Sequence, residues 1–352
     1  MMTKFPKQIF SGHFGKLHCQ GIAVDEKNGY IYYSFTTLLV KTDLEGNLIG
    51  TVDGLIGHLG CIAYNAEDGR VYGSLEFKND VIGRGILSAI GSEQSFEDAF
   101  YCAIFDVERI DRIGMSAEGD GIMRAVYLSE VVADYKGVGE GGREHKYACS
   151  GIDGTTFGVI PGDESGKQHI FVAYGIYSDL ERGDNDYQVI LCYDAKTWWD
   201  SCARPLCQSN MHKSGPDAPE AKYFLYTGNT TFGVQNLEYD AYTGDFLAAV
   251  YNGRKPQFPN YSMYVIDGKI APKRSTHRAT GEEILELSLK REGLSEGEIY
   301  GNNFPLGSTG IYSFGNGYYY FSAPGRDDEG QFTKLYLYRA TDNPSDPFIK
   351  VE

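Results

Sequence analysis

The sequence predicts an all-β fold, a five-bladed β-propeller with four antiparallel strands in each blade. The first observation is an internal repeat: residues 146–175 and 222–253 share a Lys-Tyr start, a Gly turn, the motif Thr-Thr-Phe-Gly-Val and a second apolar strand. The second is an apolar strand ending in Asp, which recurs in step with that repeat. The third is composition, since 27 Tyr, 19 Phe and 44 Gly favour half-buried strands joined by tight turns.

Five strand–turn–strand segments define the repeat. Each has an apolar strand, a polar turn containing Gly and a second apolar strand, which is the pattern of a β-hairpin. Their aligned anchor residues are Gly21, Cys61, Gly158, Gly233 and Gly310. One blade of this kind cannot bury both of its faces, so the repeated unit predicts a ring of stacked blades.

Third and fourth strands follow each hairpin. The third strands end at Asp43, Asp106, Asp194, Asp267 and, in the fifth copy, Arg339. The expected fourth strands are residues 47–52, 146–150, 222–227, 283–289 and 348–351. The long gap between the second and third hairpins leaves six blades as an alternative, with the additional blade around residues 122–135. That segment lacks both the Gly turn and the Asp-terminated strand.

A single domain over residues 1–352 is expected. Its predicted blades are residues 18–56, 57–153, 154–228, 229–306 and 307–352. Residues 5–10 are expected to pair with the last blade, because closing the ring removes exposed strand edges. Three long inserts, residues 116–145, 198–221 and 268–281, are expected to form loops.

Charge and targeting signals narrow the classes of function. The formal net charge of −16 disfavours nucleic acid and anionic lipid as partners. The N-terminal stretch lacks the continuous apolar segment of a secretory signal, and no apolar run of roughly 18 residues occurs, so we expect a cytoplasmic protein without a membrane partner. Seven scattered cysteines favour free thiols over a disulfide framework.

One blade carries a recognisable repeat motif. Residues 21–32, Gly-Ile-Ala-Val-Asp-Glu-Lys-Asn-Gly-Tyr-Ile-Tyr, resemble the blades of NHL, YVTN and gluconolactonase-type propellers. The other blades match that repeat only loosely. The resemblance implies a β-propeller over nearly the whole chain and no specific family or activity, because this architecture carries lactonases, lyases, lectins and scaffolds.

Two histidines occupy matching positions in adjacent blades. His18 and His58 each stand three residues before the anchor of their blade, and Thr155, Thr230 and Gly307 take the same position in the others. We expect this position to face the funnel at one mouth of the central channel. Two imidazoles there can act as acid and base near neutral pH or bind a divalent metal ion. Alternatively, they hydrogen-bond neighbouring loops and fill the mouth.

Loops after the second strands add charge to the same face. The candidate ligand contacts among them are Glu76, Asp179, Arg182, Arg254 and Arg326. Arg254 and Arg326 occupy comparable places in neighbouring blades, where two guanidinium groups can hold a carboxylate or a phosphate. Solvated loop tips are rich in charge in any protein, so these residues also fit an ordinary surface.

These patterns favour a propeller that binds a small polar, anionic molecule in its funnel. His18 and His58 are the catalytic candidates for a hydrolase or lyase, with Thr155 and Thr230 as ligand contacts. Whether the chain is an enzyme stays open at this point. A scaffold that presents the long inserts to a protein partner is the alternative, and a carbohydrate-binding propeller is a third interpretation, supported by the aromatic content.

Overall fold

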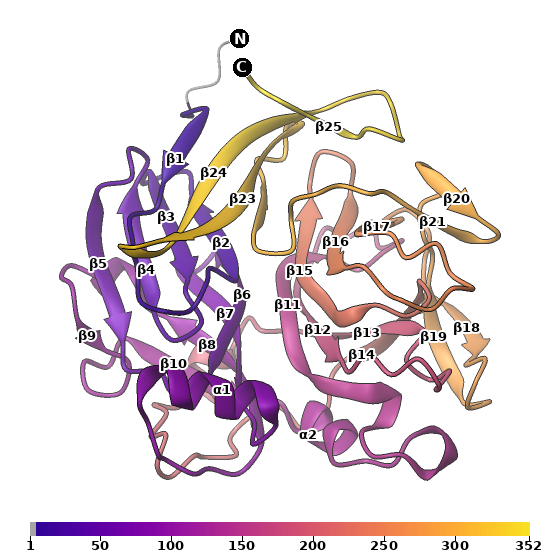
Figure 1. Ribbon diagram of the computed structural model, residues 1–352, viewed down its shortest axis with the longest axis horizontal. Coiled ribbons are helices and arrows are strands. Elements are labelled where there is room, and N and C mark those ends of the chain that lie inside the picture. Colours follow the sequence, from indigo (N-terminus) through magenta and orange to yellow (C-terminus); the bar gives the residue numbers. More distant parts are fainter. Residues whose placement is uncertain (1–4) are drawn as a thin grey trace.

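The innermost strands of the five blades form a closed ring. The computed structural model describes residues 5–352, so the first four residues of the expected domain lie outside the described residues. The ring contains β2 (Gly21–Asp25), β6 (His58–Asn65), β11 (Cys149–Val159), β15 (Thr231–Asp240) and β22 (Ile311–Ser313). Each of these strands contacts the next, and β22 contacts β2 (Figure 1). The chain is therefore a five-bladed β-propeller, and the six-bladed alternative is wrong.

Each innermost strand starts an antiparallel sheet that runs outward. The further strands are β3 (Tyr30–Ser34), β4 (Leu39–Asp43) and β5 (Leu48–Asp53) in blade one; β7 (Arg70–Phe77), β8 (Ala99–Phe105) and β10 (Met123–Tyr127) in blade two; β12 (Gln168–Ile176), β13 (Tyr187–Tyr193) and β14 (Ala221–Tyr226) in blade three; β16 (Asp245–Tyr251) and β17 (Met263–Ile266) in blade four; and β23 (Tyr318–Asp327) and β24 (Gly330–Ala340) in blade five.

Smaller elements lie around these sheets. They are α1 (Val81–Ile90), α2 (Ser129–Tyr135), α3 (Trp198–Ser201), β9 (Met115–Ser116), β18 (Lys273–Thr276), β19 (Glu283–Leu287) and the hairpin β20 (Leu294–Glu296) and β21 (Ile299–Gly301). Strand β9 extends blade one by pairing in parallel with β5. No helix within residues 5–352 is long and apolar enough to cross a membrane.

A shared turn explains part of the sequence repeat. The hairpins that follow β2, β6 and β15 begin at Asp25, Asn65 and Asp240, and in each the side chain accepts a hydrogen bond from a backbone N–H two or three residues on. Four residues after each of these lies a glycine with positive φ, such as Gly29 at 73°, whose N–H donates to the carbonyl of the first turn residue. Glycine adopts this conformation without a steric cost, so the pattern of Asx and Gly recurs.

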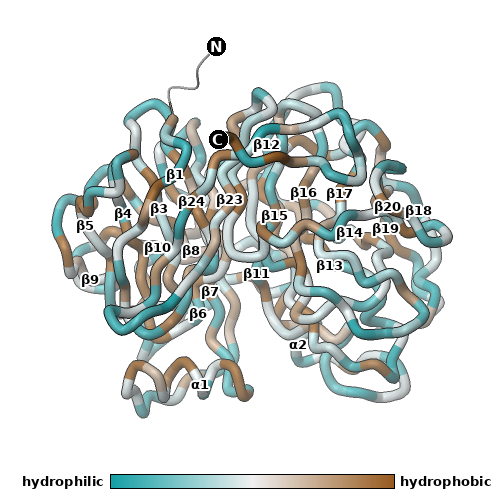
Figure 2. Tube along the Cα trace, turned by 45° about the horizontal axis from the view of Figure 1, so that its top comes forward, coloured by the Kyte–Doolittle hydropathy of each residue, from teal (hydrophilic) through white to brown (hydrophobic). Residues whose placement is uncertain are grey.

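The hydrophobic core is divided among the blade interfaces. Five clusters of buried side chains fill the five interfaces between neighbouring blades, for example Tyr32 of blade one with Leu75 and Tyr101 of blade two. Apolar stretches accordingly follow the strands, whereas the peripheral loops are hydrophilic (Figure 2). Each blade buries its faces only against its neighbours, which is the physical reason that the unit must repeat.

Two terminal strands close the ring. Strand β1 (Gln8–Phe10) pairs antiparallel with residues 334–336 of β24, and β25 (Phe348–Lys350) pairs with residues 338–340 of the same strand. Figure 1 shows β1 in indigo beside β24 in yellow, with both chain ends at the same side. The outer edge of blade five is thus completed from both ends of the chain.

We expect the single apolar side chain that β1 buries to matter for stability. Ile9 is 2 % exposed and packs in the cluster between blades five and one. Ile9→Ala should lower the free energy of unfolding by about 2–4 kcal/mol, because it leaves a cavity in that cluster. Chemical denaturation measures the change, and Gln8→Ala, on the exposed face of the same strand, should be close to neutral. Equal effects of the two substitutions would contradict closure by β1.

Two expected fourth strands differ from the structure. In blade two the fourth strand is β10, whereas residues 146–150 form a short turn and the start of β11 in blade three. In blade four, residues 283–289 do not pair with β17 as a ladder; β19 joins β14 of blade three in parallel, and β18 extends that sheet. Isolated bridges from Met263 to Asn302 and from Ile266 to Leu289 cover β17 instead. Both segments are apolar enough for either edge, so the pattern alone does not choose between them.

The long inserts pack on the propeller itself. Helix α2 in the first insert packs against β8 and β11, and so fills the space between blades two and three. The second insert crosses to blade two, where Arg204 bridges Ala125, and Gln208 bonds the carbonyl of Gly54 in blade one. All seven cysteines are free thiols, as the sequence predicts.

Candidate functional site

A cluster of charged side chains lies where the innermost strands of blades two and three begin. His58 opens β6, Glu76 lies opposite it on β7, and Asp153 lies near the start of β11. The Nδ1 atom of His58 is 3.2 Å from Glu76 Oε1 and 3.6 Å from Asp153 Oδ1. Lys78 completes the cluster, with its Nζ 2.6 Å from Glu76 Oε1. We call these four residues the axial cluster.

The strands dictate which of these groups reaches the surface. Glu76 and Lys78 are two residues apart and therefore point to the same side of their strand, into the protein, where they are 2 % and 4 % exposed. Lys78 also donates to the carbonyl of Ser150 at 2.7 Å, and Glu76 Oε2 accepts from the backbone of Ile152. His58 and Asp153 are 11 % and 13 % exposed. The ion pair is thus buried behind an imidazole and a carboxyl that solvent reaches.

Close backbone packing makes room for the carboxyl groups. Gly151 has φ +126°, and a Cβ there would collide with the Glu76 carboxylate. A Cβ at Gly60 would lie 2.8 Å from Asp153 Oδ1. Both glycines are therefore needed for the charged side chains to reach the axis.

Burial and neighbouring charges set the protonation states. Burial alone would lower the pKa of His58, but its hydrogen bond with Glu76 and the charge of Asp153 outweigh burial and raise it. Burial raises the pKa of Asp153 to about 7; the nearby Glu76 charge acts in the same direction, and the His58 charge opposes them. Burial would also raise the pKa of Glu76, but Lys78 and His58 lower it. The cluster thus contains a buried ion pair, an imidazole whose pKa is raised and a carboxyl group whose pKa is raised to about 7.

A second layer of contacts orients Lys78. Asp80 caps α1 by accepting from the Gly83 N–H, and it also accepts from the Tyr177 hydroxyl at 2.7 Å. Its other neighbour is Lys78 Nζ at 3.8 Å. His145 packs against Tyr177, with ring centroids 5.0 Å apart. Side chains from blades two and three, Asp80 and Tyr177, therefore support the Lys78 side of the axial cluster.

His18 lies close enough to His58 for the two imidazoles to influence each other. Burial lowers the pKa of His18, and the charge of His58 lowers it further, so the two imidazoles are within electrostatic reach. Across residues 5–352, no group of three or more His, Cys, Asp or Glu side chains is arranged to bind a metal ion. The Lys78 ammonium supplies the positive charge beside Glu76 that a metal would supply.

Aromatic side chains of blade four border the cluster. Gln235 donates to Asp153 Oδ2 at 3.1 Å and to the carbonyl of Phe232 at 2.9 Å. Phe232 has φ +66° and is 42 % exposed, and its ring lies 6.2 Å from that of Tyr251. Tyr251 and Ser308 line a cavity of about 430 Å³ between blades four and five. Burial raises the pKa of Tyr251; a hydrogen bond with Ser308 opposes this shift, and the charge of Asp153 adds to it.

The predicted threonines lie inside the protein. Thr155 is 1 % exposed and seventh in β11, which already begins at Cys149, so it lies beyond the mouth. Its hydroxyl donates weakly to the Asp153 carbonyl at 3.5 Å. Thr230 is fully buried, and its hydroxyl donates to Gln188 at 3.3 Å. Neither hydroxyl faces solvent at the funnel.

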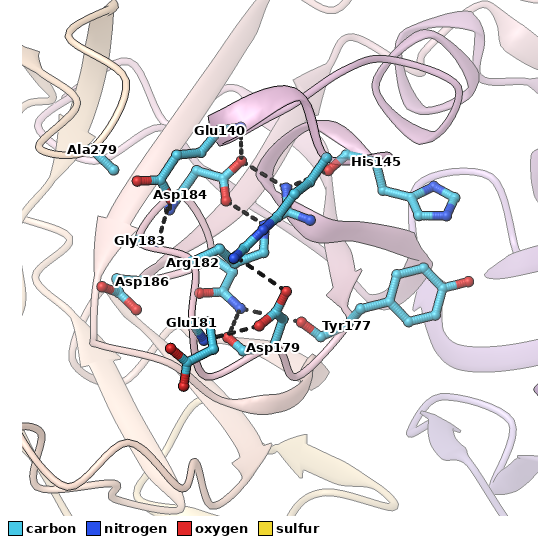
Figure 3. Close-up of polar contacts among 12 residues, drawn as sticks. Glu140, His145, Tyr177, Asp179, Glu181, Arg182, Gly183, Asp184, Asp186 and Ala279 are labelled. Atoms are coloured by element: carbon cyan, nitrogen blue, oxygen red, sulfur yellow. Dashed lines mark hydrogen bonds and ion pairs between the residues drawn. The ribbon is translucent and has the colours of Figure 1, made fainter.

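Arg182 and Asp179 take part in loop structure. Arg182 is 5 % exposed, pairs with Asp184 through Nε at 2.6 Å, and donates to the carbonyls of Glu144 and His145 (Figure 3). Asp179 forms an ion pair with Arg143 at 3.3 Å. These contacts fasten the loop after β12 to the insert of blade two and leave the Arg182 guanidinium occupied.

Arg254 and Arg326 are exposed side chains. Arg254 lies in the loop after β16, and Arg326 lies near the end of β23, directly before the Asp327 that pairs with His13. Within residues 5–352 neither guanidinium forms a hydrogen bond or an ion pair. Nothing in their contacts joins them into a clamp.

Sequence reasoning missed Asp153 and the role of Lys78. Asp153 stands in the repeat Gly-Ile-Asp-Gly-Thr-Thr-Phe-Gly, where a charged residue interrupts the apolar pattern expected of an innermost strand, as Glu238 does in blade four. Lys78 is flanked by Glu76 and Asp80 at spacings of two, which predicts one face of a strand. Both signals can be recognised in the sequence, but the sequence does not show that blades two and three bring these residues together.

Comparisons with known proteins assign no family to the chain. No protein-family model and no curated protein matches the chain. Similar solved structures include the PQQ domain of pyranose dehydrogenase from Coprinopsis cinerea in its holo form, at 10% identity and TM-score 0.34 over 94% of this chain and 95% of that one. A GH43 β-1,3-galactosidase with galactodeoxynojirimycin matches at 13% identity and TM-score 0.43 over 97% and 98%. The Dos1 propeller matches at 10% identity and TM-score 0.34 over 95% and 81%.

Proposed function

We propose that the protein binds a small polar, anionic molecule beside Asp153 and His58 and acts on it as a hydrolase or lyase. The observation that supports this proposal is the pairing of a carboxyl group whose pKa is raised to about 7 with an imidazole 3.6 Å away, both partly open to solvent. Groups that titrate near the working pH are the effective general acids and bases. A buried ion pair with a purely structural role would require neither the Asp153 carboxyl group nor the His58 imidazole beside it.

The charge balance of the axial cluster favours an anion. Glu76 and Lys78 neutralise each other, and Asp153 is largely uncharged on the acid side of its pKa. The remaining charge is that of protonated His58, whose Nε2–H donates no hydrogen bond to any residue of the part of the chain that the structure describes. A ligand carboxylate could accept from this N–H as a charge-assisted hydrogen bond.

The neighbouring groups suggest the division of roles. Asp153 would donate a proton to a leaving group, or take one from a carbon next to the carboxylate, while His58 holds the anion. The cavity beside Tyr251 offers about 430 Å³ for the rest of the molecule. The strained, exposed Phe232 lies beside Tyr251 and would contact the bound molecule, since backbone strain of this kind concentrates at functional sites.

A panel of small hydroxy acids, uronates and sugar lactones tests this proposal. Calorimetry measures binding, acid release reports hydrolysis, and ultraviolet absorbance reports an unsaturated elimination product. His58→Asn keeps a donor near the Nδ1 position but removes Nε2, and it should weaken binding of any active acid by about tenfold or more. Lys27→Gln, in the exposed hairpin after β2, is the matched control and should bind as the wild type does.

Two outcomes would contradict the proposal. One is a wild-type protein that neither binds nor converts any member of the panel near pH 6, where His58 carries its charge. The other is a His58→Asn variant that binds as tightly as the wild type. Turnover that disappears in Asp153→Asn while binding persists would instead assign the proton transfer to Asp153.

Carbohydrate binding is the second candidate function. The exposed Phe232 ring beside Tyr251 is suited to stack on the apolar face of a sugar. In that case neutral sugars should bind without conversion, and Phe232→Ala should weaken them more than His58→Asn does. The scaffold interpretation gains no comparable support, because the inserts pack against the propeller.

A further inference from the structure

A second cavity lies at the opposite mouth of the ring. Its volume is about 270 Å³, and all five innermost strands contribute to it. Representative lining residues are Ala23, Tyr64, Phe157, Glu238 and Tyr312, one from each blade. Tyr64, Phe157 and Glu238 lie toward the C-terminal ends of their strands, whereas the axial cluster lies toward the N-terminal ends of β6 and β11.

A polar plug separates the two mouths. Asn236, which is 1 % exposed, donates to the carbonyls of Gln20 and Ser308 at 2.8 and 3.0 Å. Its side-chain oxygen accepts from the Cys61 thiol at 3.4 Å. These contacts join four blades across the axis. The second cavity is therefore a site distinct from the one proposed for catalysis.

One carboxyl group faces this cavity without a cationic partner. Glu238 Oε1 accepts from the Ser313 N–H at 2.7 Å, and Oε2 lies 3.5 Å from the Thr156 hydroxyl. Within residues 5–352 no Lys, Arg or His forms an ion pair with Glu238. Glu238 is half-buried, and carboxyl groups withdrawn from water are ordinarily paired, so this one has unused capacity for a positive charge.

Most of the remaining lining is aromatic or apolar; its other polar members are Asn65, Glu67, Thr156 and Gln168, and it contains no basic residue. Its four aromatic rings belong to Tyr64, Phe157, Tyr239 and Tyr312. Three of them are fixed from behind by other rings: Tyr64 by Tyr32, Phe157 by Tyr72 and Tyr239 by Phe246. Aromatic faces attract cations, and a rigid set of them around a carboxyl group is the arrangement that recognises organic ammonium ions.

We propose that this cavity binds a small organic ammonium ion, with Glu238 as its counter-ion and the aromatic rings as its walls. The volume admits a compact amine. The net charge of −16 would draw cations toward the molecule before they reach the site. The proposal is independent of the chemistry proposed for the axial cluster.

Protonation of Glu238 gives this site a defined pH dependence. Burial and the charge of Asp240 raise the pKa of Glu238 to about 8, against the effect of the Ser313 hydrogen bond. The titratable groups that face it are Asp240 on its own strand, Cys61 on β6 and Tyr312 on β22, which donates to Glu26. The pKa of Cys61 is raised to about 12 and that of Tyr312 well above 10, so both stay neutral.

Tetramethylammonium is the best probe because its charge does not depend on pH. We expect its affinity, measured by calorimetry or by NMR shifts of residues lining the cavity, to rise by about tenfold or more between about pH 6 and pH 9 as Glu238 ionises. Binding below the pKa of Glu238 should release a proton, which appears as a dependence of the binding heat on the buffer. The neutral isostere tert-butanol should bind much more weakly at every pH.

Two variants make the test decisive. Glu238→Gln keeps an acceptor for the Ser313 N–H and replaces a carboxyl that is mostly neutral near pH 7, so it should fold; it should lose about tenfold or more in affinity near pH 9 and lose the pH dependence. Glu67→Gln removes the carboxylate at the exposed rim and should change affinity by no more than about twofold. The proposal is overturned if the wild type does not bind tetramethylammonium, if tert-butanol binds equally well, or if Glu238→Gln binds as the wild type does.

Discussion

Lys78→Met should lower the free energy of unfolding by about 3–5 kcal/mol near neutral pH, the largest effect that we expect from a substitution in the axial cluster. The Lys78 ammonium is 4 % exposed and the Glu76 carboxylate only 2 %, with 2.6 Å between Nζ and Oε1. Removing the ammonium leaves a buried carboxylate with His58 as its remaining charged partner. It also leaves the carbonyl of Ser150 without its donor.

The pH dependence of this loss follows from Glu76. In the wild type the pKa of Glu76 is lowered, so its pairing stabilises the fold above the unfolded pKa and is lost as pH falls through the folded value. Without Lys78 the pKa of Glu76 rises, and protonation at acidic pH removes the uncompensated charge. The deficit of Lys78→Met relative to the wild type should therefore be smaller near pH 5 than near pH 7.5.

A second substitution and a matched control separate this explanation from a general loss of packing. Adding Glu76→Gln to Lys78→Met removes the buried charge and should recover more than half of the lost stability. Lys213→Met makes the same change in the exposed pair with Glu97, where the side chains are 65% and 71% exposed, and should cost no more than about 1 kcal/mol. Denaturation curves that show similar losses for Lys78→Met and Lys213→Met would contradict a buried ion pair.

The sequence predicts the ring of five blades better than it predicts which blade each outermost strand joins. Each hairpin turn needs an Asx residue and a glycine at a fixed spacing, so the hairpins can be recognised as a repeat in the sequence. Examples are Asp25 with Gly29 and Asp240 with Gly244. Edge strands have no such marker. The segment containing Leu285 is apolar and β-branched enough to complete blade four, yet it pairs with Tyr223 and its neighbours in blade three.

The candidate site was predicted only in part, for a related reason. His58 was found because its strand starts in register with the repeat, and Glu76 because it lies at the end of the partner strand. Thr155 and Thr230 were taken from an alignment on the Thr-Thr-Phe-Gly-Val motif, but β11 begins at Cys149 and β15 at Thr231, so the shared motif lies at different depths in the two blades. The charge-rich loop around Arg182 predicts an exposed side chain. In the structure Arg182 is buried and pairs with Asp184.

The same comparison explains why Asp153 is informative. A carboxyl group within an innermost strand contributes nothing to the repeat, and its burial opposes folding at neutral pH. Such a residue departs from the local rules of its fold, which is typical of functional positions. Its energetic cost should therefore be measurable.

Asp153→Asn should become more stable than the wild type as pH rises. The pKa of Asp153 is raised from 3.8 in the unfolded chain to about 7 by burial and by the Glu76 charge, against the His58 charge. Below the unfolded pKa both states carry the proton, and no penalty exists. Between the two values the unfolded state ionises first, so the wild type loses stability, and above about pH 7 the full penalty applies. The shift corresponds to roughly 4 kcal/mol.

Denaturation at about pH 4.5, 6 and 8 measures this difference directly. The free energy of unfolding of Asp153→Asn should nearly equal that of the wild type at the lowest pH and exceed it by more at each higher pH. The loss of the favourable interaction between His58 and the Asp153 charge should reduce this difference. That loss has its own readout, because the NMR titration midpoint of His58 should move to lower pH in the variant. Asp163→Asn is the control with the opposite sign: hydrogen bonds with Ser165 lower the pKa of Asp163, so its carboxylate stabilises the fold above the unfolded pKa, and removing it should cost a similar amount of stability at all three pH values. If the Asp153→Asn advantage were the same at all three pH values, Asp153 would not be the proton-holding group that the proposed chemistry requires.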